Sequence, residues 1–188
     1  MSITIITPPT EEPITLTQVK VQVRVDDAAS DDLLTSLIAA ARQHVEARTG
    51  RGLITQTRVL RLGDFPEQIV LREGLLQAIS SVTYVDVDGV VQTLDETAFQ
   101  VDPYSDPPRI MAAYASIWPT TRCQPNAVTV TYVCGYADAA SVPNDIKAAL
   151  LMIVADLFAN REASVIGATY VETTAVTNLL APHMSYAS

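Results

Sequence analysis

Hydrophobic residues recur with helical spacing in two separate segments of the chain. The first segment follows Ser30, a residue type that caps helix N-termini, and ends at Gly50, the residue type that most often follows a helix. The second begins beyond Pro143, which suits a first helical turn, and continues to about Glu162. The apolar positions are Leu33, Leu34, Leu37, Ile38, Ala41 and Val45 in the first segment, and Ile146, Leu150, Ile153, Val154, Leu157 and Phe158 in the second. Both patterns predict amphipathic helices, which we expect to pack against each other.

The first 25 residues are less regular. Thr15 or Thr17 would cap a short helix from Leu16 to about Val25, but the valines at 19, 21, 23 and 25 alternate as in a strand, so both structures stay open. Residues 1–15 contain three prolines and are expected to form an extended leading arm outside the core.

Between the two helical segments the apolar residues alternate with polar ones, and β-branched residues become frequent. The strand candidates are Thr55–Leu62, Ile69–Leu71, Ile79–Asp86, Val90–Leu94, Phe99–Val101, Arg109–Met111 and Ala127–Cys134. Asp88-Gly89 separates two of them and is a strong signal for a hairpin, which we expect to turn with type I′ geometry.

These elements together predict an α+β fold in a single domain, 1–188. Residues 16–50 and 142–162 would form an antiparallel helical core of two N-terminal helices and one long C-terminal helix. An antiparallel β region, 53–135, is inserted between them. The terminal segments would be extended, and the tail, 163–188, is apolar but lacks a convincing core period.

The charge balance narrows the function. The chain has 188 residues with 12 basic and 21 acidic side chains, a net charge of -9. Proteins that grip phosphate backbones or anionic membranes need a basic face, so both classes are disfavoured. The N-terminal sequence has no basic segment followed by a long apolar one, as a secretory signal would. Cys123 and Cys134 are expected to be reduced thiols, with a disulfide left open.

Candidate catalytic and metal-binding arrangements are weak. Gly50-Arg51-Gly52 follows a helix and precedes a strand, the wrong order for a phosphate-binding loop. The acidic residues lack EF-hand spacing, and neither histidine has a nucleophile or further ligand at a useful spacing. We interpret these side chains as capping, turn or solvated residues, and the aromatic ones as loop packing: Asp26, Asp27, Asp31, Asp32, Asp86, Asp88, His44, His183, Trp118 and Tyr136. No catalytic residue, cofactor or metal site is predicted.

The order of these elements and several short motifs resemble one family, over about residues 9–182. The matching stretches are TPPTEEPITLTQVKVQVRV at 7–25, LIAAARQHVEARTGRGLITQT at 37–57, VTYVDVDG at 82–89, SIWPTTRCQPNAVTVTYVCGY at 116–136, VPNDIKAALLMIVADLFANRE at 142–162 and LLAP at 179–182. With them the chain resembles the head–tail connector, or adaptor, proteins of long-tailed bacteriophages, prophages and gene transfer agents.

The resemblance implies a structural virion protein at the head–tail interface, assembled in the bacterial host cytoplasm. Members form a ring, usually of 12 copies, between the portal protein and a stopper or tail-completion protein. The ring extends the channel through which packaged DNA passes without sequence-specific binding. The family has no catalytic site, and its terminal segments reach neighbouring copies or the portal.

The apolar tail fits such a docking segment, because exposed apolar side chains would be a liability on a monomer. The expected partner-docking residues are Leu179, Leu180, Pro182, Met184 and Tyr186. The alternatives are another tail-completion or stopper ring protein, which would tend to be mostly β, and a monomeric binding module that never enters particles. A small enzyme is disfavoured, because no nucleophile is paired with a base.

Overall fold

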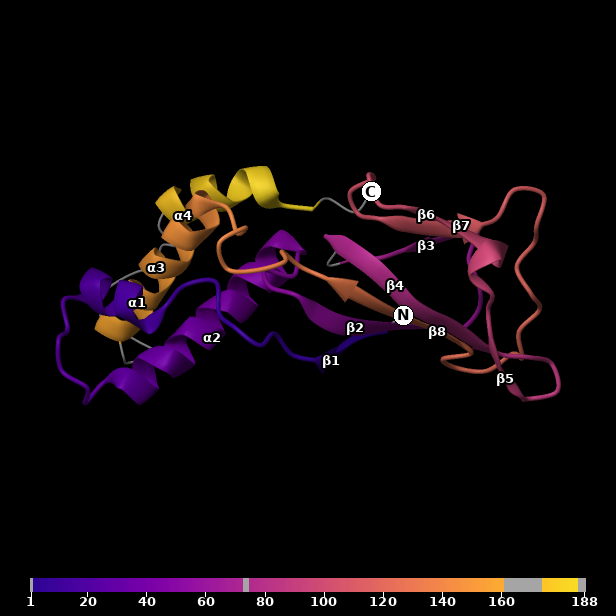
Figure 1. Ribbon diagram of the computed structural model, residues 1–188, viewed down its shortest axis with the longest axis horizontal. Coiled ribbons are helices and arrows are strands. Elements are labelled where there is room, and N and C mark those ends of the chain that lie inside the picture. The colour runs from indigo at the N-terminus through magenta and orange to yellow at the C-terminus, as the bar shows by residue number, and fades with distance from the viewer. Residues whose placement is uncertain (1, 73–74, 161–173, 186–188) are drawn as a thin grey trace, which may run out of the picture. The chain divides into compact units, whose positions relative to one another are not determined.

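A computed structural model describes residues 2–72, 75–160 and 174–185 (Figure 1). The chain divides into two compact units. The helical unit comprises residues 11–54 and 136–184, and the β unit comprises 1–10, 55–135 and 185–188. The predicted α+β class is confirmed, since four α-helices and two antiparallel sheets make up the described chain.

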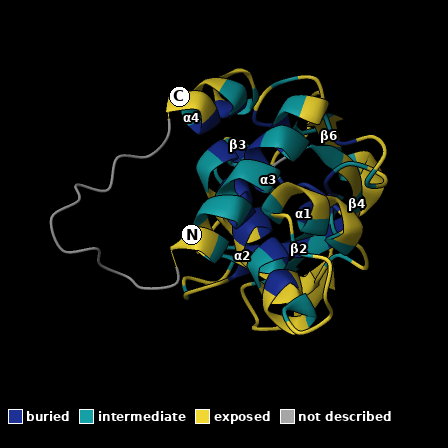
Figure 2. Ribbon diagram, turned by 90° about the vertical axis from the view of Figure 1, so that its left-hand side faces the viewer, coloured by how far each residue is buried: buried dark blue, intermediate teal, exposed yellow. Residues whose placement is uncertain are grey.

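The helical unit is built around one long C-terminal helix, as the apolar spacing predicts. Its helices are α1 (Leu16–Val23), α2 (Asp31–Thr49), α3 (Asn144–Ala159) and α4 (Thr174–Leu180), followed by a 3₁₀ turn, Ala181–His183. Helix α3 packs against α1, α2 and α4. Buried positions lie along α2 and α3, and the other positions of these helices are half-buried or exposed (Figure 2). The fully buried residues at this contact include Leu34, Ile38, Val45, Ile146, Leu150 and Val154.

Local capping decides the structure of the first helix. The Thr15 side chain accepts a hydrogen bond from the Gln18 backbone N–H at 3.2 Å, and the Gln18 side chain accepts one from the Thr15 backbone N–H at 2.8 Å. This reciprocal pair is a capping box, which satisfies two donors at the helix start. The valines at 19, 21 and 23 therefore lie in a helix, in which Val19 alone is buried, and Val25 lies beyond its end. Gly50 ends α2 at φ 65°, a left-handed conformation that suits glycine.

The β unit contains two antiparallel sheets. The larger sheet has the order β1 (Ser2–Thr7), β2 (Gln56–Leu62), β8 (Val128–Cys134), β4 (Leu76–Val85) and β5 (Val91–Thr93). The smaller has the order β3 (Gln68–Val70), β7 (Arg109–Ala112) and β6 (Phe99–Asp102), and a 3₁₀ turn, Glu96–Ala98, precedes β6. Their shared core includes Leu60, Ile69, Val82, Ile110, Val130 and Tyr132.

The leading arm is extended, as predicted, but the expectation that it lies outside the core elements is wrong. Residues 2–7 form β1, which pairs with β2 in the register Ser2 to Arg61 and Ile5 to Arg58. The prolines that suggested an isolated arm begin only at Pro8, after the strand has ended. Ile3 packs partly buried against the core of the β unit.

The predicted hairpin is present, but its turn is not of type I′. Among the turn residues only Gly89 has a positive φ, 86°, whereas a type I′ turn needs two. The Asp86 backbone N–H donates to the Val90 carbonyl at 2.9 Å, which leaves a three-residue loop. The Asp86 carboxylate accepts further bonds from the backbone N–H groups of Asp88 and Val90 and from the Gln92 side chain. The Gln92 hydrogen bond is the largest cause that lowers the pKa of Asp86.

The tail also contains a core helix that the sequence pattern did not reveal. In α4, Val176 and Leu180 lie four residues apart on one face, and both are buried in the core of the helical unit. Two buried positions in seven residues are too few for a recognisable period. The predicted end of α3 near Glu162 lies outside the described residues, and the described helix ends at Ala159.

Candidate functional site

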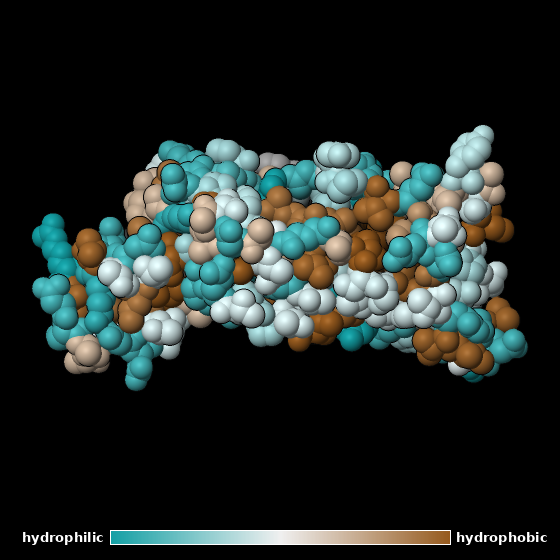
Figure 3. Space-filling view, viewed as in Figure 1, coloured by the Kyte–Doolittle hydropathy of each residue, from teal (hydrophilic) through white to brown (hydrophobic). Residues whose placement is uncertain are grey.

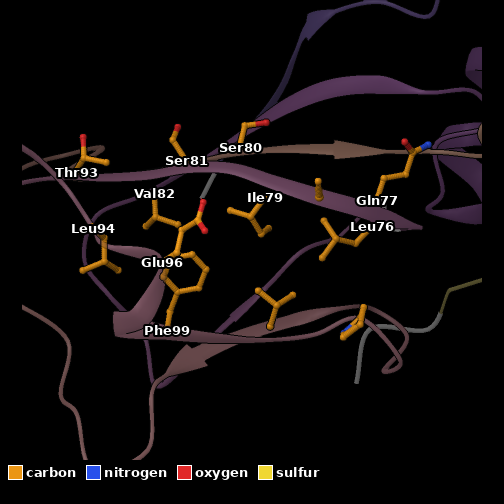
Figure 4. A pocket seen from close by; sticks show the side chains of 13 residues that line it. Leu76, Gln77, Ile79, Ser80, Ser81, Val82, Thr93, Leu94, Glu96 and Phe99 are labelled. Carbon is orange, nitrogen blue, oxygen red and sulfur yellow. The ribbon is translucent and has the colours of Figure 1, made fainter.

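A groove in the surface of the β unit lies between β4 and the segment that leads into β6 (Figure 4). Its volume is about 460 Å³. It is lined by Leu76, Gln77, Ala78, Ile79, Ser80, Ser81, Val82, Thr93, Leu94, Glu96, Phe99, Val101 and Pro103. Because most of these side chains are apolar, the groove suits an apolar segment of a macromolecule better than a charged ligand.

The groove exists because β5 is short. Strand β4 pairs with β5 only over Thr83–Val85, and one further bond joins the Leu94 N–H to the Val82 carbonyl at 2.8 Å. The remaining part of β4, residues 76–81, pairs with β8 on its other side. No described strand covers its outer edge, so the space between the two sheets stays open there.

Bulges in β4 set which side chains enter the groove. The pairing of β4 with β8 shifts register between Leu76 and Ala78 and again between Ile79 and Ser81. Across a bulge two residues oppose one, which interrupts the strict alternation of faces. Leu76 and Ile79 point toward Phe99, whereas Ser80 and Ser81 both point away from it (Figure 4).

The groove holds little that could do chemistry. Glu96 is its one carboxylate, and it is exposed. In residues 2–72, 75–160 and 174–185 no group of three His, Cys, Asp or Glu side chains is placed to hold a metal ion. Over the same ranges no helix is long and apolar enough to cross a membrane. The groove thus offers apolar surface and strand backbone, which are means of binding a polypeptide.

Several large apolar side chains on the loops of the β unit are exposed to solvent. Hydrophobic patches are visible on this surface (Figure 3). Tyr104 is 96% exposed, Tyr114 93% and Ile117 92%. The neighbouring Trp118 is held inside: its ring stacks on Phe65 with centroids 4.8 Å apart and planes 7° apart. The interpretation of Trp118 as loop packing is therefore confirmed, and the exposed residues are available for contacts with another chain.

The structure separates the five residues predicted to dock a partner. Leu180 is fully buried in the core of the helical unit, so its expected exposure was wrong: α4 turns it toward α3. Leu179 is partly buried against the same core, Met184 is half-buried and Pro182 is exposed. Tyr186 lies outside the described residues. A docking role for this segment stays a prediction.

Two polar contacts tie the end of the described chain to the helical unit. The Arg48 guanidinium donates to the Thr177 hydroxyl at 3.1 Å. His183 Nε2 lies 2.6 Å from Asp145 Oδ2, and this hydrogen bond is the largest cause that lowers the pKa of Asp145. His183 is thus held by a carboxylate of the first turn of α3.

A largely buried network of ion pairs connects the segment before α1 with α2 and with the turn that follows α2. Arg42 Nε donates to Glu12 at 2.8 Å, and its Nη1 donates to Glu46 at 3.2 Å. The other Glu46 oxygen accepts from the Leu53 N–H at 2.9 Å, beyond the end of α2. Glu46 and Arg42 therefore hold the turn at Gly50-Arg51-Gly52, which acts as the predicted helix end and not as a phosphate loop.

Two residues of the predicted acidic cluster make local contacts. Asp31 bonds Lys20 at 2.5 Å, and Asp27 accepts from the Ala29 N–H at 3.0 Å, so members of the acidic cluster serve local contacts. The two cysteines are not joined: Cys123 is exposed and Cys134 buried.

The groove and the free edge of β1 were missed by sequence reasoning. A signal for the edge was present, because SITIIT at 2–7 is an uncharged run rich in β-branched residues. No local sequence signal marks the groove, because it depends on where β5 ends and on the path of the chain from β5 into β6.

Comparison with known proteins finds one matching family model and several solved structures with a similar fold. The family model of phage gp6-like head-tail connector proteins matches residues 13–87. No curated protein sequence matches the chain. Among solved structures, a chain in the neck of an empty gene transfer agent particle, computed with C6 symmetry, has a TM-score of 0.82 at 20% identity. A chain in the virion of a native gene transfer agent particle has a TM-score of 0.82 at 19% identity.

A third structure, the neck of a native gene transfer agent particle computed with C12 symmetry, has a TM-score of 0.77 at 19% identity. Each alignment covers 100% of this chain and 97% of the other. The resemblance seen in the sequence is confirmed: residues 13–87 carry the pattern of the phage gp6-like head–tail connector family, and the whole chain has the fold of these gene transfer agent proteins.

Proposed function

We propose that the chain is a structural virion protein that forms a ring between the portal and the tail or stopper and joins head to tail. The observation that carries the proposal is the agreement of two independent comparisons. The family model matches a head–tail connector, and the fold over the full length matches chains from particle necks.

A ring needs two different surfaces on each copy. In a head-to-tail contact one face of a subunit meets another face of its neighbour, and a rotation that closes produces a ring. The neck structures similar to this chain were computed with C6 and C12 symmetry, which supports a ring of 12 copies as the proposal. The groove at β4 and the exposed apolar residues of the β unit supply surfaces for such contacts.

The charge distribution suits the wall of a DNA channel. A wall rich in free basic groups would bind phosphates and hinder passage. The net charge is -9, Arg42 is buried in its ion network and Arg48 bonds Thr177 within the helical unit. Arg24 is exposed. The proposal therefore expects a channel lining poor in arginine.

The C-terminal segment is proposed to dock the portal through residues beyond α4. Pro182, Met184 and Tyr186 are the docking candidates, while Leu180 and in part Leu179 hold the segment to the helical unit. Truncation after His183 keeps the buried α4 residues and the His183–Asp145 contact, and removes Met184 and Tyr186. We expect this truncated chain to fold as the full chain does and to be absent from particles.

The test is deletion of the gene in a strain that produces the particles, with the intact gene supplied in trans as the control. We expect tailless heads beside free tails in electron micrographs, and heads whose DNA is lost to nuclease. Normal tailed particles would contradict the proposal and favour a binding module outside the virion. Tails that attach but leak DNA would favour a stopper protein.

A further inference from the structure

At one edge of the larger sheet, part of β4 has an unpaired backbone that could accept a further strand. Residues 76–81 of β4 line the groove and have no described strand beside them, since β5 begins to pair only near Val82. An uncovered strand edge presents unpaired backbone N–H and C=O groups, which readily take up another strand. Here the edge also borders apolar space, so an added strand would gain side-chain burial as well as backbone bonds.

At the opposite edge of the same sheet lies a strand, β1, that could add to the sheet of another copy. Strand β1, Ser2–Thr7, is the last strand in the order, and its outer side faces no described strand. Charged side chains and proline, which proteins use to blunt such an edge, are absent from SITIIT, and the one irregularity in its pairing lies at the end of the strand, between Ile5 and Thr7. Ile5 is 43% exposed and Ile6 52%, an unusual exposure for residues of this kind in a strand.

The two edges fit each other in length and direction. The donor has six residues and the acceptor spans 76–81. Each neighbouring pair from β1 through β2 and β8 to β4 is antiparallel, so β1 and β4 run in opposite directions. A β1 strand from a second copy, placed beside β4 so that the sheet continues, would therefore pair with it in the antiparallel manner.

We propose that β1 of one copy adds to the free edge of β4 of the next copy and closes the groove between the two sheets. Ile3 already faces the core of its own β unit, and Ile5 shares its face two residues on. In the added position this face turns toward Phe99 and Val101 of the neighbour, which line the groove. The contact is head-to-tail, so it deepens and rests on the proposed ring.

Cysteine cross-linking tests the contact directly. Within one copy β1 and β4 are separated by β2 and β8, hence by three strand spacings, about 14 Å. A disulfide needs Cα atoms less than about 7 Å apart, so a bond between these strands has to join two copies. Thr4 is exposed on the face opposite Ile3 and Ile5, and Ser80 and Ser81 lie on the face of β4 away from the groove (Figure 4).

The experiment uses the full chain in particles, in a Cys123→Ser background that removes the exposed native thiol. Thr4→Cys is combined in turn with Gln77→Cys, Ser80→Cys and Ser81→Cys, to sample neighbouring registers. After mild oxidation we expect at least one pair to give a ladder of covalent multimers that reduction abolishes. Thr4→Cys alone, and Thr4→Cys with Val21→Cys on α1, are the controls and should give none.

Each outcome has one meaning. If the chain is in the particles and no pair cross-links, the strand addition is wrong while the ring stands. If Ser80→Cys or Ser81→Cys cross-links to a different protein, the edge takes a foreign strand and the proposal is wrong. Absence of the unmodified chain from particles would contradict the proposed function itself, and with it the proposed contact.

A charge placed on the donor edge gives a second, independent readout. Ile5→Lys puts an ammonium group where the neighbour's apolar groove would receive it, and lysine on an edge strand opposes pairing. We expect loss of this variant from particles. Val21→Lys, at a side chain 76% exposed on α1, is the matched control and should be incorporated as the unmodified chain is. Equal incorporation of both variants would overturn the proposal.

Discussion

His183 and Asp145 join the end of the described chain to the first turn of α3, with 2.6 Å between Nε2 and Oδ2. The carboxylate lies at the N-terminal end of the helix, where a negative charge is favoured by the helix dipole. The same carboxylate thus serves the helix start and the segment after α4, so the attachment of that segment depends on the ionisation of Asp145.

The first prediction concerns pH. The pKa of Asp145 is lowered on folding, chiefly by the hydrogen bond with His183. A lowered folded pKa stabilises the native state above the unfolded value of 3.8, and this contribution is lost as the pH falls through the folded pKa. We expect Asp145→Asn to be less stable than the unmodified chain at pH 6, with the difference shrinking below about pH 4.

Urea unfolding followed by circular dichroism at several pH values between 3 and 7 measures this difference. Asp138→Asn is the matched control, because Asp138 also has a lowered pKa but bonds Ser141 instead of His183. Adding His183→Gln should remove most of the effect of Asp145→Asn but leave that of Asp138→Asn. A difference independent of pH would contradict the assignment to ionisation.

The second prediction separates core from docking in the tail. Leu180 is fully buried, so Leu180→Ala should lower the free energy of unfolding by about 3 kcal/mol through lost burial and the cavity left behind. Pro182→Ala, at an exposed position, should change stability by less than about 0.5 kcal/mol. Urea unfolding measures both. A small effect of Leu180→Ala would mean that α4 is not held in the core.

Elements in which many apolar residues repeat the same spacing were predictable from the sequence, and elements with few such residues were not. Thirteen residues from Leu33 to Val45 carry six apolar positions at helical spacing, and α2 follows. Helix α4 has two buried residues, and β1 owes its place to pairing with β2, which is distant in sequence. Local pattern carries no information on such pairing.

The site was less predictable than the fold for the same reason. Apolar content identified Leu179, Leu180 and Met184 as residues that need a partner, but it did not distinguish a partner on another chain from α3 of the same chain. The groove is defined by residues 76–81, beside which no strand of the described residues lies. An absence of pairing is a property of the completed sheet, so no stretch of sequence encodes it alone.

The third prediction addresses the buried ion network. The side chains of Arg42 and Glu46 are 8% and 6% exposed. Arg42→Met removes a guanidinium that pairs with the buried Glu46 carboxylate, and breaking a buried ion pair by removing one partner typically costs about 3–5 kcal/mol. Adding Glu46→Gln should recover part of that loss, because the charge is gone while an oxygen remains to accept from the Leu53 N–H. Urea unfolding of Arg42→Met, of Glu46→Gln and of the double variant measures this coupling.

Additive losses in that pair would contradict the prediction, since independent sites add and interacting ones do not. Arg24→Met is the control: Arg24 is exposed at the end of α1, at φ 57°. Its replacement keeps an unbranched side chain at the same backbone position and should change stability by less than about 1 kcal/mol.

The fourth prediction concerns the hairpin turn between β4 and β5. Gly89 has φ 86°, and a Cβ at this position would meet the Arg122 guanidinium. The guanidinium is the far end of a flexible side chain and moves away, so the backbone conformation dominates the cost. Gly89→Ala should therefore destabilise the β unit by about 1–2 kcal/mol. Gly63→Ala is the matched control, since nothing lies within 4 Å of its added Cβ and its φ is not in the left-handed region.

Gly63→Ala should be neutral or slightly stabilising, because alanine restricts the unfolded chain more than glycine does. Fluorescence of Trp118, the one tryptophan of the chain, reports on the β unit because its ring stacks on Phe65 there. Equal unfolding midpoints for the two variants would show that the turn relaxes to accept a side chain. If the turn does not relax, its strain also disturbs β4, whose edge forms the proposed strand-addition contact. We therefore expect Gly89→Ala to enter particles less efficiently than Gly63→Ala.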